Sequence, residues 1–144
     1  MYRNRFLVKS YGDNLEGTKI GIEKSIELLS THSSLVIVVP DLNSVRSGGL
    51  LEQALGHQVF KHLLKTREIV LGNTATLSLC TQATLKNFKR AEAYLALWGS
   101  KYTIDEIEAL YDWKSVVFVT HIPEDSADWE KRQRVNVIYD DRRG

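Results

Sequence analysis

The chain has 144 residues, 43% of them hydrophobic, and its 19 basic and 18 acidic residues leave a formal net charge of +1. This length is typical of one globular domain, spanning residues 1–144, and the balanced charge gives no strong signal for nucleic-acid binding. The chain has no apolar run of the roughly 18 residues that a membrane span needs, and its one cysteine, Cys80, excludes an internal disulfide, so we expect a cytoplasmic protein without a membrane partner.

The beginning of the chain predicts a strand and then a helix. Residues 5–11 (RFLVKSY) have an apolar centre between polar ends, as a strand does, and a turn cluster follows them. We expect a helix after Gly17, because Ile22, Ile26 and Leu29 are spaced by four and three residues.

Two unbroken apolar runs, Leu35–Val39 and Val116–Val119, define the predicted architecture. Neither run has a polar side chain to turn toward water, so each predicts a strand that is buried on both faces. Such strands are typical of a parallel sheet that lies between helices. We therefore expect both runs to form interior strands that are parallel to each other.

The middle of the chain predicts one helix and then two strands. Residues 51–63 place apolar side chains at helical spacing, and we expect Gly56, inside this helix, to mark a close helix–sheet contact. Residues 68–71 and 76–80 have the composition of strands, with a Gly-Asn turn signal between them. This pattern fits either a hairpin near 68–80 or a long loop.

The next segment predicts a polar helix at 81–90 and a fourth main strand at 93–97. Thr103 and Glu106 have the spacing of a capping box, in which the hydroxyl and the carboxylate each accept from the other residue's backbone amide. The box predicts a helix that begins at Thr103.

A short helix near 125–132 and an edge strand near 135–139 complete the predicted elements. Strands and helices alternate with short connections, which favours a three-layer α/β fold: a Rossmann-like open sheet, mostly parallel, with helices on both faces. In such a sheet, ligands bind beyond the carboxyl ends of the strands, where the strand order reverses.

Polar and aromatic residues follow several of the predicted strands. Because the carboxyl ends of parallel strands point the same way, we expect these residues to converge on one side of the sheet. Residues of these types form small-ligand sites, although they also end strands and cap helices. Trp98 has a ring that can stack on a planar ligand. The residues expected on this rim are Asp13, Asp41, Trp98, Ser100 and His121.

Two glycine-containing loops are candidate cofactor-binding segments. The first lies between a strand and a helix, as a phosphate-binding loop does, but its Thr18-Lys19 order reverses the Walker A pattern and favours an ordinary turn. The second precedes a helix, so that its amides are able to receive an anion, although a flexible turn is the simpler interpretation. The candidate residues of the two loops are Gly12, Asp13, Asn14, Ser47, Gly48 and Gly49.

Asp41 and His121 are the candidate catalytic residues. If their strands are neighbours, the carboxylate and the imidazole form a general acid–base pair, whereas a histidine that bonds to local backbone is the structural alternative. No metal site is expected, because His57 and His62 are five residues apart and lie on different sides of their helix. Cys80, in a strand, is more typical of a small buried hydrophobe than of a reactive thiol.

The leading hypothesis is a small α/β domain that binds a nucleotide-like or anionic small molecule at the carboxyl ends of its strands. The alternative is a non-enzymatic protein-interaction module that forms a homo-oligomer, with Trp113 and Trp129 in its interface if they are partly exposed. A third, weaker hypothesis is an enzyme that uses Asp41 and His121. The sequence identifies no cofactor.

Overall fold

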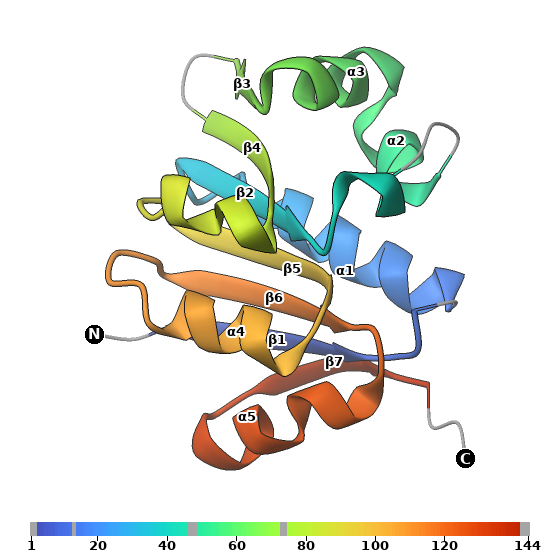
Figure 1. Ribbon diagram of the computed structural model, residues 1–144, viewed down its shortest axis with the longest axis vertical. Helices are drawn as coiled ribbons and strands as arrows, with labels where there is room; N and C mark the ends of the chain where they lie inside the picture. Colours follow the sequence, from blue (N-terminus) through green and yellow to red (C-terminus); the bar gives the residue numbers. More distant parts are fainter. Residues whose placement is uncertain (1–2, 13, 46–48, 73–74, 142–144) are drawn as a thin grey trace.

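The computed structural model describes residues 3–12, 14–45, 49–72 and 75–141 and shows an α/β fold built on one sheet (Figure 1). The seven strands lie in the order β3-β4-β2-β5-β6-β1-β7. All neighbours are parallel except β3 and β4, which are antiparallel. This order confirms the mostly parallel sheet, the hairpin alternative and the edge strand near the C-terminus. The strands are β1 (Asn4–Lys9), β2 (Ser34–Val39), β3 (Glu68–Leu71), β4 (Ala75–Thr81), β5 (Ala93–Gly99), β6 (Ser115–Thr120) and β7 (Asn136–Asp140).

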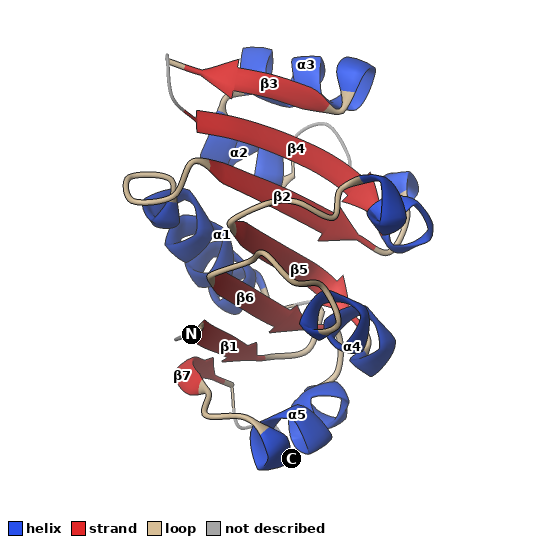
Figure 2. Cartoon of the chain, turned by 90° about the vertical axis from the view of Figure 1, so that its left-hand side faces the viewer, coloured by secondary structure: helices blue, strands red, loops and turns tan. Residues whose placement is uncertain are grey.

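Helices lie on the two faces of the sheet (Figure 2). One hydrophobic cluster joins the sheet to α1, α2 and α3, and a second joins it to α4 and α5. Within the described residues, no helix is long and apolar enough to cross a membrane. The α-helices are α1 (Leu15–Leu28), α2 (Leu50–Leu55), α3 (His57–Thr66), α4 (Lys101–Glu108) and α5 (Ala127–Arg132), and the 3-10 helices are η1 (Leu42–Ser44), η2 (Gln82–Asn87) and η3 (Pro123–Ser126).

The two apolar runs form interior strands, as predicted. β2 lies between β4 and β5, and β6 lies between β5 and β1. Ile37 and Val117 point into the cluster beneath α1, whereas Val36 and Phe118 point into the cluster beneath α4. Because successive side chains alternate between two buried faces, every position of these runs is apolar. The two strands are not neighbours, however, since β5 separates them.

The prediction of one helix over 51–63 is wrong at Gly56. The chain forms two helices, α2 and α3, that meet at this glycine, whose φ is +88°. A Cβ at Gly56 would meet nothing within 4 Å, so a close helix–sheet contact does not explain the residue. The explanation is the positive φ at this position, which glycine adopts readily and residues with a side chain rarely adopt.

The polar helix expected at 81–90 is shorter than predicted. Only Gln82–Asn87 is helical, in the 3-10 conformation of η2, and the chain then runs without helix to β5. The short helix expected at 125–132 begins as η3 and continues as α5.

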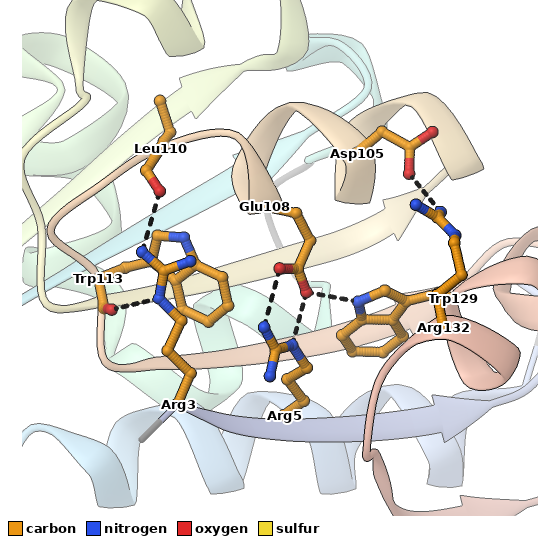
Figure 3. Close-up of polar contacts among 8 residues, drawn as sticks. All are labelled: Arg3, Arg5, Asp105, Glu108, Leu110, Trp113, Trp129 and Arg132. Atoms are coloured by element: carbon orange, nitrogen blue, oxygen red, sulfur yellow. Dashed lines mark hydrogen bonds and ion pairs between the residues drawn. The ribbon is translucent and has the colours of Figure 1, made fainter. Parts of the chain in front are cut away.

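A polar cluster fastens the first strand to α4 and α5 (Figure 3). The Arg5 guanidinium donates to both carboxylate oxygens of Glu108, at 2.6 and 3.0 Å, and the Trp129 indole donates to the same carboxylate at 2.7 Å. Although burial opposes ionisation of Glu108, the hydrogen bonds from Arg5 and Trp129 and the positive charge of Arg5 and Arg3 hold its pKa below the usual value. The cluster therefore depends on an ionised Glu108.

The same cluster buries Trp113. The Arg3 guanidinium lies 4.1 Å from the centre of the Trp113 ring and donates to the backbone oxygens of Leu110, Tyr111 and Trp113. Trp113 is fully buried beneath this cation. A cation over the face of an indole adds attraction to the area that the ring buries.

Candidate ligand-binding cavity

A cavity of about 540 Å³ opens at the carboxyl edge of the sheet. The adjacent strands β2 and β5 lead to α2 and α4, which lie on opposite faces of the sheet (Figure 2). The cavity therefore lies where the connections change faces, the usual place of ligands in open α/β sheets. Its lining comes from the ends of β1, β2, β4, β5 and β6 and from α4 and η3: Gly12, Pro40, Asp41, Gln82, Trp98, Gly99, Ser100, Thr103, His121 and Asp125.

Trp98 is the most unusual residue of the cavity. Its φ is +56°, a conformation that bulky side chains rarely adopt, at a point where the register between β5 and β6 shifts. Its indole nitrogen donates to the hydroxyl of the buried Thr18 at 3.1 Å, which tethers the half-buried ring to α1. Strained residues held by their surroundings in this way are concentrated at binding and catalytic sites.

The start of α4 forms another wall and corrects the predicted capping box. The N-cap lies three residues before Thr103: it is Ser100, whose hydroxyl accepts from the amide of Tyr102 at 3.2 Å. Thr103 is the third helical residue, and its hydroxyl accepts from the Ser100 amide at 3.2 Å while it donates to the Gln82 side chain at 2.7 Å. Ser100 therefore has both a capping role and a place in the cavity.

We expect Ser100→Ala to lower the free energy of unfolding by about 1 kcal/mol, because it removes the acceptor at the start of α4. Ser100→Asp, which keeps a capping oxygen, should cost clearly less. Chemical denaturation of the two variants measures the difference. Equal losses in both would show that the capping bond contributes nothing to stability.

His121 lies against Gly12. The Gly12 amide donates to the His121 backbone oxygen at 2.8 Å, and a Cβ added to Gly12 would lie 2.5 Å from the imidazole Nδ1. Glycine at position 12 thus leaves the space that the imidazole occupies at the mouth of the cavity. The sequence pattern indicated Gly12 for a different reason, a phosphate-binding loop.

Asp41 and His121 line the same cavity, but their strands are not neighbours. β5 lies between β2 and β6, so the backbones are two strand spacings apart, about 9.6 Å, rather than one. The condition for a directly paired carboxylate and imidazole is therefore not met. Asp125 adds a second carboxylate to the wall, and among the described lining residues there is no lysine or arginine.

Asn14 lies outside the cavity lining and caps α1. Its side-chain oxygen accepts from the Gly17 amide at 2.9 Å, and its amide group donates to Tyr139 and Asp141 at 3.0 and 3.1 Å. Asp141 also accepts from the Tyr11 amide, so that a carboxylate of the chain already lies beside the start of the helix.

Of the other loop candidates, the structure describes only Gly49. Gly49 directly precedes the six-residue helix α2 and does not line the cavity. The remaining three, Asp13, Ser47 and Gly48, lie outside the described residues.

Metal and thiol chemistry find no support in the described residues, which contain no group of three or more His, Cys, Asp or Glu side chains suited to a metal ion. His57 pairs instead with Glu52, at 2.7 Å. Cys80 is buried, and burial raises the pKa of its thiol to about 12. This burial confirms the reading of Cys80 as a buried hydrophobe.

The structure contains one serine–histidine contact that the sequence pattern did not indicate. His32 Nε2 lies 2.9 Å from the Ser115 hydroxyl, and His32 Nδ1 lies 3.0 Å from the backbone oxygen of Leu28. This resembles a nucleophile with its base. Ser115 is fully buried at the amino end of β6, however, so the contact joins the turn after α1 to the sheet and offers no surface to a substrate.

Gln82 and Asp125 are cavity residues that the sequence analysis missed. Gln82 directly follows β4, so the strand-end rule alone would have indicated it. Asp125 belongs to η3 and is brought to the cavity by a turn after β6, which leaves no comparable signal.

No family model, no curated protein and no solved structure matches this chain.

Proposed function

We propose that the protein binds a small, planar, nucleoside-like molecule in the cavity at the carboxyl edge of the sheet. The observation that carries the proposal is Trp98, a strained and tethered indole at a site where open sheets bind ligands. We also infer that the two helical layers and the sheet form a Rossmann-like three-layer domain. An aromatic face binds the flat side of a base or similar ring by stacking.

The charge of the wall favours a neutral or cationic ligand over an anion. Asp125 places a carboxylate in the wall, and the described lining residues include no lysine or arginine that would attract an anion. Carboxylates, amides and hydroxyls at such a position accept hydrogen bonds from sugar hydroxyls or exocyclic amines. Ser100 and Gln82 supply such groups beside the carboxylates. Of the two ligand classes that the sequence suggested, we therefore keep the nucleotide-like molecule, in the form of a nucleoside, and not the anion.

The alternative of a homo-oligomeric interaction module has less support. Trp113 and Trp129 are buried and so do not contribute aromatic rings to an interface. The most exposed large hydrophobic side chains, such as Leu15, Val70 and Tyr111, belong to different parts of the fold. A catalytic pair of Asp41 and His121 is not part of the proposal, because β5 separates their strands.

We expect adenosine or another nucleoside to raise the thermal midpoint of the protein, since a ligand that binds only the folded state stabilises it by mass action. Trp98→Gly should weaken the affinity about fivefold or more, because stacking on one aromatic ring contributes about 1–3 kcal/mol. Glycine is chosen because it readily adopts the φ of +56° that position 98 has, so the variant should keep the backbone conformation of β5.

The matched control is Tyr111→Ala, which removes an aromatic ring that is 86% exposed and lies outside the cavity. This variant should bind the nucleoside as the parent does. If a folded Trp98→Gly protein binds as tightly as the parent, or if a panel of nucleosides leaves the midpoint of the parent unchanged, the proposed function is wrong.

A further inference from the structure

A second cleft, of about 530 Å³, lies on the face of the sheet that α4 and α5 cover elsewhere. Its floor comes from β2, β3 and β4, near the amino ends of β2 and β4. Its wall is the segment 86–91, which runs from the last two residues of η2 toward β5. The cavity with Trp98 lies at the opposite ends of β2 and β4, about 20 Å away for a strand of six residues. One small ligand therefore does not occupy both sites.

The floor of this second cleft carries hydroxyl groups where a buried sheet face is normally apolar. Ser34, Thr76 and Ser78 point into it beside Val36. Ser78 is only 4% exposed, yet within the described part of the chain neither its hydroxyl nor that of Thr76 makes a hydrogen bond. The polar and apolar alternation of β4 thus arises because one face of the strand meets the core and the other meets this cleft.

The wall of the cleft is basic. Lys86, Lys89 and Arg90 are exposed and form no ion pair with any described residue. Glu68 is the only acidic residue among the described lining residues. Three cations face one acid in this cleft, whereas the whole chain has a net charge of +1.

We propose that this cleft binds the phosphate group of a small phosphorylated molecule. The hydroxyls of Thr76 and Ser78 donate to phosphate oxygens from the floor, while Arg90 and the two lysines donate from the wall and balance the negative charge. The volume lies within the range of small-molecule sites. A nucleic acid is a poorer fit, because a formal net charge of +1 gives little of the general attraction that such a polyanion requires.

The test is a titration with pyrophosphate, followed by NMR of the backbone amides and by calorimetry, with sodium chloride adjusted to constant ionic strength. We expect saturable shifts at Thr76, Ser78 and residues 86–91. Arg90→Ala should weaken binding about tenfold or more, the effect of losing a hydrogen bond to a charged group. The control Lys61→Ala removes an exposed cation of α3 outside the cleft and should change nothing.

Two conservative variants distinguish a specific phosphate-binding site from nonspecific attraction of anions to positive charge. Thr76→Val and Ser78→Ala keep every cation and remove only the hydroxyls, and each should weaken pyrophosphate binding about threefold or more. Unchanged binding in both would overturn the proposal, as would the absence of saturable shifts in the parent. Tighter binding of single-stranded RNA, with an affinity that grows with its length, would also overturn it in favour of a nucleic-acid surface. Each of these results is independent of whether nucleosides bind beside Trp98.

Discussion

Ile37→Asp should prevent the protein from folding. Ile37 is 1% exposed and lies in the middle of β2, among the apolar side chains that join the sheet to α1. An unpaired carboxylate there costs several kcal/mol, and the loss of the side chain's packing adds to it. The sum approaches the entire stability of a typical domain, about 5–15 kcal/mol. Circular dichroism and a thermal melt of the purified variant should show no cooperative transition.

Val70→Asp is the matched control, because it places the same carboxylate in β3 at a side chain that is 62% exposed. We expect a folded protein whose stability changes by less than about 1 kcal/mol. Cooperative unfolding of Ile37→Asp with a midpoint near that of Val70→Asp would contradict the burial of β2 on the face beneath α1.

Glu108→Ala should lower the free energy of unfolding by about 3 kcal/mol at neutral pH. The variant leaves the Arg5 guanidinium and the Trp129 indole without their acceptor, and the side chains of Arg5 and Glu108 are each only 14% exposed (Figure 3). The control is Asp105→Ala, which breaks the ion pair between Asp105 and Arg132. The side chains of these two residues are 48% and 55% exposed, so the free energy of unfolding should fall by less than about 0.5 kcal/mol.

The contribution of Glu108 should also depend on pH. Its pKa in the folded protein is below the ordinary value of 4.5, so the ionised form contributes stability above that value. This stability is lost as the pH falls through the folded pKa, and the difference between the parent and Glu108→Gln should shrink below about pH 4.5. A difference that is constant from neutral pH to the acid transition would show that the charge of Glu108 is not what holds the cluster together.

The strands could be predicted from the sequence because their side-chain pattern is local. Leu35–Val39 and Val116–Val119 are apolar at every position, which only a strand with two buried faces requires. The order of the strands could not be predicted, because nothing in residues 93–97 indicates that β5 lies between β2 and β6. For this reason the sequence indicates that Asp41 and His121 lie at the same edge of the sheet, but it does not indicate that a strand separates them.

The start of α4 could be predicted from the sequence only approximately. Ser100 and Thr103 both precede residues with the spacing of a capping box, and Glu106 made the later start the better local match. The hydrogen bond from Thr103 to Gln82, a residue far away in the sequence, accompanies the earlier start. Local patterns therefore predict that a helix begins here but not which residue caps it.

The basic cleft could not be predicted for a similar reason. Lys86, Lys89 and Arg90 have the composition of an ordinary solvated helix face, and Thr76 and Ser78 that of a half-exposed strand. Only the packing of residues 86–91 over β4 brings the cations and the hydroxyls together.

We propose that the cavity at the carboxyl edge of the sheet binds a nucleoside-like molecule. The most direct test is a titration of the isotope-labelled protein with adenosine and the other nucleosides, in which NMR follows every backbone amide. We expect saturable shifts that cluster at Gly12, Gln82, Ser100 and His121 and at the Trp98 indole, while the amides of 86–91 stay unchanged. Shifts confined to other surfaces, or no saturable shift with any nucleoside, would contradict the claim.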